Sequence, residues 1–322
     1  MLKLINAVCE DRALSEFGGQ DDFTAFLRAC GAEGAEIIRC GDDSANVIPR
    51  SSVVGVHLPF YTDWVDFWRG DKKKLSEKFG SLRAAERFYG SAGPDCLLGL
   101  ISADMDYAQS IGARYVVFHV SDVSLNETLT RSWEHTDREV IDASAQVLNA
   151  LTAGRGYSFE LLLENLPWKG FSFIDPELTA YMLSSVNYEK TAIMLDTGHL
   201  MCTCTALRTQ ADGVRYISDM LDAHKELAGR IRGIHLHQSL SGEYAEKALL
   251  DPIKLTGDYN ADFTAVYSHV TKLDRHEPFS DPRVRSLVDR IGPEYLVHEL
   301  AAKDRAEKQR LCRVQASALG ML

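Results

Sequence analysis

The sequence has no long hydrophobic run, and no stretch approaches the length of about 18 apolar residues that a membrane span needs. Residues 1–6 lack the layout of a signal peptide and instead predict a first strand. The seven cysteines are scattered and odd in number, which argues against a disulfide framework. The close pair Cys202 and Cys204 lacks the spacing of a structural zinc site. These absences predict a cytoplasmic protein.

Acidic residues outnumber basic ones, with 46 Asp and Glu against 35 Lys and Arg. A net charge of −11 argues against general affinity for nucleic acids, which requires clustered Lys and Arg. No glycine-rich phosphate loop is present, so no nucleotide or organic cofactor is expected, and an unphosphorylated substrate is favoured. No internal repeat or low-complexity linker divides the chain, and we expect one domain over residues 1–322.

Short apolar runs alternate with amphipathic segments of helical length, a pattern typical of repeated βα units around a parallel sheet. We expect eight strands, at residues 2–8, 35–40, 53–58, 114–120, 158–164, 191–196, 231–237 and 295–299. Eight such units in one chain predict a (β/α)₈ TIM barrel.

Capping residues predict where several helices begin and end. Glycines should end the helices at residues 21–30 and 95–111, and a closing helix is expected at 303–319. An aspartate before a proline predicts a helix start at Asp175, Asp251 and Asp281.

Two segments are longer than usual βα loops, residues 59–94 and 238–280. Both follow strands, so both should lie over the carboxyl-terminal face of the barrel, where barrel enzymes have their active sites. We expect them to wall the pocket. Contact with a second subunit of a homo-oligomer is the alternative for the aromatic part of residues 59–94.

Ionisable residues recur at the ends of the later strands. Glu164, Asp196 and Glu299 each end an apolar run, and His235 and His237 end another. A buried charge costs several kcal/mol unless it is paired or bound to a cation, so these strand ends predict a shared divalent metal. Buried structural ion pairs are the alternative for any one of these residues alone.

Strand alternation restricts which side chains enter the barrel. His235 and His237 face the same way, so either is a candidate ligand, whereas Glu299 and His298 must face opposite ways. We expect Glu299 to point inward and His298 toward the helices. Three carboxylates with one imidazole suit Mn²⁺, Co²⁺, Mg²⁺ or Zn²⁺.

These motifs resemble the xylose-isomerase-like barrels, a superfamily that includes sugar isomerases, sugar epimerases and endonuclease IV. The resemblance rests on Glu164-Asn165, Asp196-Thr197-Gly198-His199, His235-Leu236-His237-Gln238-Ser239, Asp274-Arg275-His276 and Glu299. It implies a catalytic metal held by Glu164, Asp196, His235 and Glu299, with His237 as the alternative histidine.

Endonuclease IV is similar in further detail, because it binds three zinc ions. The resemblance implies additional ligands at His57, His119, His199, Asp274 and His276. However, the loops that would meet DNA differ from the nuclease pattern. The sequence departs from the nuclease pattern at residues 120–122, 237–240 and 277–282.

The resemblance favours an enzyme, a metal-dependent isomerase or epimerase acting on a sugar or similar small molecule. Glu164 and Glu299 would exchange the proton of a metal-stabilised enediolate, and His199 would orient a hydroxyl. Expected substrate-binding residues are His57, His119, Trp168, His237 and His276. The alternatives are an endonuclease IV-like zinc phosphodiesterase acting on abasic DNA and a non-catalytic metal-binding barrel.

Overall fold

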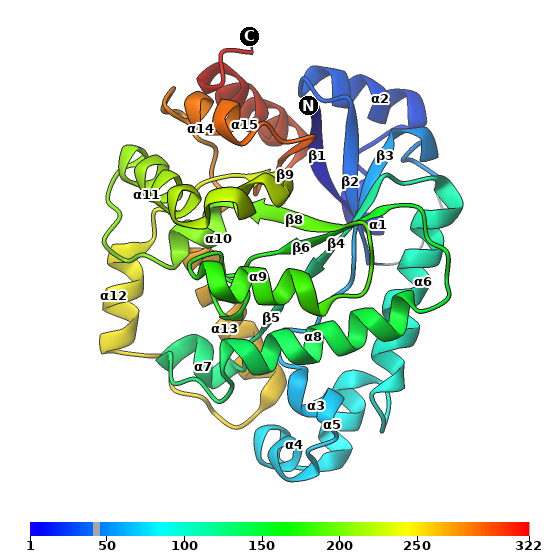
Figure 1. Cartoon of the computed structure of the whole chain (residues 1–322), viewed down its shortest axis with the longest axis vertical. Coiled ribbons are helices and arrows are strands. Elements are labelled where there is room, and N and C mark those ends of the chain that lie inside the picture. Colours follow the sequence, from blue (N-terminus) through cyan, green and yellow to red (C-terminus); the bar gives the residue numbers. More distant parts are fainter. Residues whose placement is uncertain (41–45, 322) are drawn as a thin grey trace.

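The computed structural model describes residues 1–40 and 46–321, and its central feature is a closed barrel of parallel strands. The strands follow one another around the barrel in the order β1-β10-β9-β8-β6-β4-β3-β2 (Figure 1). Their bounds are β1 Leu2–Cys9, β2 Gly34–Arg39, β3 Val53–His57, β4 Tyr115–His119, β6 Glu160–Glu164, β8 Thr191–Asp196, β9 Ile231–Leu236 and β10 Tyr295–His298. Each coincides within a few residues with a predicted apolar run, so the predicted (β/α)₈ barrel is confirmed.

Helices surround the barrel and alternate with its strands. The helices are α1 Asp11–Leu14, α2 Gln20–Ala29, α3 Val65–Arg69, α4 Lys72–Phe79, α5 Leu82–Tyr89, α6 Asp95–Ile111, α7 Leu125–Thr130, α8 Asp137–Thr152, α9 Pro176–Ser185, α10 Thr197–Cys202, α11 Gln210–His224, α12 Gly242–Leu250, α13 Tyr259–Leu273, α14 Val284–Ile291 and α15 Arg305–Ala318. The 3₁₀ turns η1 Arg50–Ser52 and η2 Lys225–Arg230 and a short hairpin of β5 Ser121–Asp122 with β7 Lys169–Gly170 complete the described elements. Within the described residues, no helix is long and apolar enough to cross a membrane.

The capping predictions are partly right. Asp175 caps α9 through its side chain, with Pro176 at the first helical position. The prediction at Asp251 is wrong, because Asp251 is the residue that ends α12. A proline restricts the residue before it to non-helical conformations, so Pro252 stops a helix here. The next helix, α13, starts later and is capped by Asp258.

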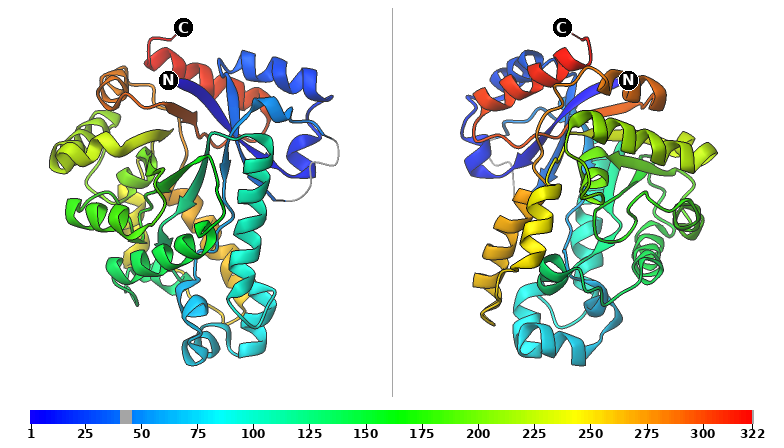
Figure 2. Two further views of the ribbon diagram at one scale, coloured as in Figure 1. Left: turned by 45° about the vertical axis from the view of Figure 1, so that its right-hand side comes forward. Right: turned by 90° about the vertical axis from the view of Figure 1, so that its left-hand side faces the viewer.

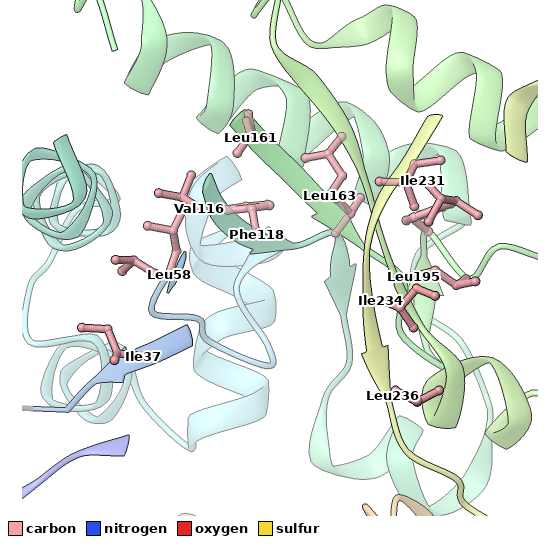
Figure 3. Packing of buried hydrophobic residues seen from close by; sticks show 14 of the residues in the cluster. Ile37, Leu58, Val116, Phe118, Leu161, Leu163, Leu195, Ile231, Ile234 and Leu236 are labelled. Carbon is pink, nitrogen blue, oxygen red and sulfur yellow. The ribbon is translucent and has the colours of Figure 1, made fainter. Parts of the chain in front are cut away.

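Strand alternation divides the apolar core into two parts. Residues such as Leu161, Leu163 and Val116 point outward and pack in the layer between strands and helices (Figure 3). Residues such as Leu162 and Val117 belong to a separate cluster of buried residues within the barrel. Because side chains on one face recur every second residue, the residues two positions further along these strands, Glu164 and His119, continue the inward row at the carboxyl-terminal mouth.

Tyr115 fills the barrel below the mouth and requires a glycine beside it. It is fully buried, and a Cβ atom added at Gly55 on the neighbouring strand would lie 2.2 Å from its ring. No larger residue fits at position 55 without moving the ring that supports the layer above.

The two long segments are largely helical and lie at the end of the barrel opposite the two termini (Figure 1). The segment after β3 contains α3, α4 and α5. The segment after β9 contains α12 and α13, which lie side by side (Figure 2). Both helices also contact α7, so these elements form a wall on the side of the barrel mouth.

The contact between Gly55 and Tyr115 generates the first prediction. Gly55→Ala should lower the free energy of unfolding by about 1–3 kcal/mol, because overpacking forces a rearrangement of the ring. Gly99→Ala is the matched control, since a Cβ atom on this exposed position of α6 meets nothing within 4 Å. It should be neutral or raise stability by up to about 1 kcal/mol. Urea unfolding checks both variants, and equal stabilities would contradict the assigned packing.

Candidate metal centre

Glu164 is the centre of the candidate site, and both of its carboxylate oxygens are engaged. Oε2 lies 3.2 Å from Nε2 of His57 and 3.2 Å from Nε2 of His119. Oε1 lies 3.3 Å from Nδ1 of His235 and 3.3 Å from Nδ1 of His199. One buried carboxylate therefore faces two groups of histidines, one at each oxygen.

A second group of side chains shares Glu164 and adds the ends of β8, β9 and β10. Nδ1 of His235 lies 2.9 Å from Oε2 of Glu299 and 3.8 Å from Oδ2 of Asp196. Ligand atoms of Glu164, Asp196, His235 and Glu299 all lie within 4.8 Å of one another. The structure thus brings together the four residues that the sequence predicted as one metal site.

A third group is built by the segment that follows α13. Oδ2 of Asp274 lies 3.2 Å from Nε2 of His199 and 2.6 Å from Nε2 of His276. A backbone bridge between Gln238 and Glu277 brings this segment beside the end of β9. The hydroxyl of Ser239 also donates to Oδ1 of Asp274, at 3.0 Å.

His276 adopts a backbone conformation that is rare for a side-chain-bearing residue, with φ of 46°. Such left-handed conformations cost free energy and persist only where surrounding contacts enforce them. Here, the carbonyl of His276 accepts from the amide of Ala301, and Nδ1 of its ring lies 3.1 Å from the carbonyl of Glu299. The conformation aims Nε2 at Asp274.

The histidines present one ring nitrogen to the centre and have the other nitrogen fixed. Nδ1 of His57 lies 3.0 Å from the carbonyl of Leu58, and Nδ1 of His199 lies 3.0 Å from that of Asn165. A carbonyl at Nδ1 accepts the proton of that nitrogen and directs Nε2 toward a carboxylate, Glu164 for His57 and Asp274 for His199, an arrangement common in metal sites.

Glu36 has the same role for His235, and the sequence analysis missed it. This buried residue of β2 lies 3.0 Å from Nε2 of His235 through Oε1. Its Oε2 accepts from the hydroxyl of Tyr115 at 2.8 Å. The available signal was a lone carboxylate within the apolar run of the second strand, at a position that does not end the strand.

His237, the alternative histidine, supports Asp196. Its Nε2 lies 2.9 Å from Oδ2 of Asp196, and its ring stacks on His276 with centroids 4.0 Å apart. A Cβ atom at Gly198 would lie 2.0 Å from the His237 ring, so the glycine of the Asp-Thr-Gly-His motif makes room for this histidine. His237, His276 and Glu299 also form a ligand group of their own among the described residues.

Burial shifts the pKa of each group in the site so that its neutral form is favoured, whereas nearby opposite charges shift the pKa so that the charged form is favoured. Burial acts to raise the pKa of Glu164, but the nearby His119 and His235 hold it well below its usual range. Burial acts to lower the pKa of His276, but the Asp274 carboxylate raises it to about 9. The pKa of His199 is raised well above its usual range by Asp196 and Asp274, despite burial. With a pKa of about 9, the His276 ring is doubly protonated at neutral pH when no metal is bound.

The donor arrangement fits divalent cations. Three sets together contain most of the candidate ligands: a first of His57, His119 and Glu164, a second of Glu164, Asp196, His235 and Glu299, and a third of His199, Asp274 and His276. The group of His237, His276 and Glu299 overlaps the second and third sets. Among the described residues, Nδ1 of His235 and Oε2 of Glu299 are buried and lie 2.9 Å apart as an ion pair, but neither has a hydrogen bond of good geometry. A buried polar atom without a well-formed hydrogen bond costs up to about 1–3 kcal/mol, and a cation shared by the two atoms would offset part of this cost.

A cavity of about 360 Å³ lies over these groups, which is within the range of small-molecule sites. The floor of this cavity is lined by His57, His119, His199, His276 and Glu299, and its wall includes Trp168. His298 points away, because its Nδ1 lies 2.8 Å from the amide nitrogen of Gln315 on α15.

Comparison with protein families supports the same classification. A family model described as the xylose isomerase-like TIM barrel matches residues 97–311, which are 215 of the 322 residues. The chain belongs to this family. No curated protein sequence matches this chain.

Several solved structures are similar over nearly the whole chain. Endonuclease IV from Thermus thermophilus is 12% identical, with a TM-score of 0.55 and 100% of both chains covered. A D-tagatose 3-epimerase-like protein is 14% identical, with a TM-score of 0.54 and coverage of 99% of this chain and 98% of that one. The IOLI protein with a bound zinc atom is 13% identical, with a TM-score of 0.52 and coverage of 99% and 98%. At these identities, the similarity establishes the fold alone.

The raised histidine pKa values generate a prediction about metal binding. Because His276 has a pKa of about 9, a metal must displace its proton at neutral pH. The apparent affinity for Zn²⁺ should therefore rise between pH 6 and 8, by about tenfold per pH unit for each displaced proton. Calorimetry in buffers of different ionisation enthalpy measures the released protons. An affinity that does not change with pH would contradict the prediction.

The contact between Glu36 and His235 generates another prediction. Glu36→Gln should weaken metal binding by about 10–100-fold, because a neutral amide no longer fixes and polarises the ligand histidine. Competition with a chelator measures the affinity, and urea unfolding is measured alongside. Tyr115→Phe is the comparison variant, since it removes the hydroxyl that contacts Glu36 but leaves the carboxylate in place, and its loss of metal affinity should be smaller. A larger loss of metal affinity in the comparison variant would place the effect in general packing.

Proposed function

We propose that this barrel is a metal-dependent hydrolase of phosphate esters that acts on a small substrate. The observation that carries the proposal is the convergence of three donor sets, two of which share the carboxylate of Glu164. Sites with two or more adjacent metals are suited to displacement at phosphorus, since both the attacking and the leaving oxygen need charge stabilisation.

Glu164 is the main reason for ranking hydrolysis above isomerisation. A base that removes a proton from carbon needs an oxygen with free access to that proton. Both oxygens of Glu164 face histidines at 3.2–3.3 Å, and the side chain is buried below the cavity. This arrangement supports a bridging ligand rather than a mobile base.

His57 and His119 point to the same conclusion. Their Nε2 atoms lie 3.0 Å apart, and both face Oε2 of Glu164. A site with one metal in the second donor set would leave His57 and His119 as substrate-binding residues, which does not explain why both face an oxygen of a buried carboxylate. Occupation of the first set accounts for two imidazoles aimed at one carboxylate oxygen.

The walls of the cavity argue for a small substrate over a DNA duplex. Helix α13 lines the cavity and contacts α7, so these two helices narrow one side of the barrel mouth. Arg275 is the only lysine or arginine among the described cavity residues, and it is paired with Glu277. A duplex needs many contacts from cationic residues to its phosphates.

Hydrolysis adds water across a P–O bond, with the hydroxyl going to phosphorus and the proton to the leaving oxygen. Divalent cations held by the three sets would supply charge stabilisation on the phosphoryl oxygens and a more acidic water. Asp274 and His276, which line the cavity, would hold the cation of the third set, and that cation would face the phosphoryl group. A substrate that covers the apolar wall would displace water from the cavity, which would strengthen these electrostatic interactions.

Isomerisation or epimerisation of a sugar is the second candidate. The observation that favours it is the completeness of the second donor set, in which Glu164 and Glu299 flank His235. In that mechanism, Glu299 would be the freer of the two bases, because it also lines the cavity.

Metal analysis and two assays distinguish the candidates. The zinc-loaded protein should hold more than one metal per chain and hydrolyse bis(4-nitrophenyl) phosphate. His119→Ala should lose about one metal per chain and lower kcat by a factor on the order of 10²–10³, as expected when a charge-stabilising group is lost. His269→Asn is the control, because this histidine contacts Tyr244 and belongs to none of the donor sets. One metal per chain, with solvent deuterium exchange into ketoses and no diester hydrolysis, would support the isomerase instead.

A further inference from the structure

Helix α13 presents a continuous stripe of side chains to the cavity. The stripe follows the i, i+3, i+4, i+7 and i+8 spacing of one helical face. The residues of the stripe that line the cavity are Phe263, Val266, Tyr267, Val270 and Thr271. Val266 is buried, but Phe263 and Tyr267 are 37% and 62% exposed. Large apolar groups that line a cavity and stay accessible offer area that a ligand can cover.

Aromatic residues from other loops complete the wall. Phe60 follows β3, is 50% exposed and packs against His119 with ring centroids 4.2 Å apart. Trp168 follows β6 and lines the same cavity. Four aromatic side chains from three segments therefore surround the space above the metal-ligating residues.

Polar recognition groups are few in this wall. Apart from the predicted metal ligands and the aromatic residues, the polar side chains of the described cavity are three threonines and Arg275. A sugar needs several hydrogen bonds to its hydroxyls, and a site lacking partners leaves those hydroxyls desolvated and unpaired. The wall is thus matched to a ligand part without hydroxyl groups.

We propose that the substrate is a phosphate ester of an aromatic alcohol, with its ring held by the stripe of α13 and by Phe60 and Trp168. The phosphoryl part of this assignment rests on the proposed function, and the aromatic part rests on the cavity wall. Aromatic pairs contribute free energy beyond their buried area, so a wall of aromatic residues favours a ring over an alkyl chain of equal size. The metal-ligating floor then fixes the phosphoryl end.

Binding of two phosphonates tests the ligand class without requiring turnover. Phenylphosphonate should bind the zinc-loaded protein at least about tenfold more tightly than methylphosphonate, because the ring adds buried apolar area. The double variant Phe263→Ala and Tyr267→Ala should reduce this ratio toward one. Leu250→Ala is the control, since Leu250 is an exposed apolar residue of α12 that does not line the cavity, and it should keep the wild-type ratio.

A kinetic arm separates this inference from the proposed function. Hydrolysis of benzyl phosphate is compared with hydrolysis of methyl phosphate by the release of inorganic phosphate, because the two leaving alcohols are similar in basicity and only one has a ring. A higher kcat/KM for the benzyl ester, lost in the double variant, supports both proposals. Preferred binding of phenylphosphonate without hydrolysis of either ester supports the aromatic ligand class and removes the hydrolase function. Equal affinities for the two phosphonates, or an unchanged ratio in the double variant, would overturn the inference.

Discussion

The burial of charge at the barrel mouth is the constraint on which the site depends. Carboxylates and imidazoles from six strand ends lie a few ångströms apart, in an interior where unpaired charge costs several kcal/mol. Without metal, proton sharing between histidines and carboxylates keeps the group paired, as the raised pKa of His276 and the lowered pKa of Glu164 indicate. The proposed divalent cation would replace several of these protons at once, which links its binding to pH.

Rigid support below this layer explains how so many donors keep their orientations. Tyr115 occupies the space beside Gly55, its hydroxyl donates to Glu36, and Glu36 in turn fixes His235. The barrel interior therefore supports the site directly. The packing of the Tyr115 ring positions Glu36, and Glu36 orients the candidate ligand nitrogen of His235.

The sequence predicts much of this architecture because the signals are local. Each strand is an apolar run of the right length, and alternation along it tells which ends enter the barrel, as with Glu299 and His298. Asp274 and His276 lie at the barrel mouth, as the Asp-Arg-His motif predicts. A backbone bridge between Gln238 and Glu277 brings them there, and no local sequence pattern encodes this bridge. Glu36 was missed because it lies inside its strand rather than at the end, and its role becomes visible only when β2 and β9 face each other across the barrel. Asp251 was misread because an Asp-Pro pair can stand at the start or just after the end of a helix, and here it follows the last residue of α12, Leu250.

The contact between Gly198 and His237 has a consequence for how this chain can change over time. The ring occupies the volume that any side chain at position 198 would need, and the same ring holds Asp196. The two positions should consequently evolve as a pair: relatives with a bulkier residue at 198 should also have replaced the histidine at 237 and found another partner for the aspartate. Correlated exchange at these two positions would thus trace which lineages retain this form of the site.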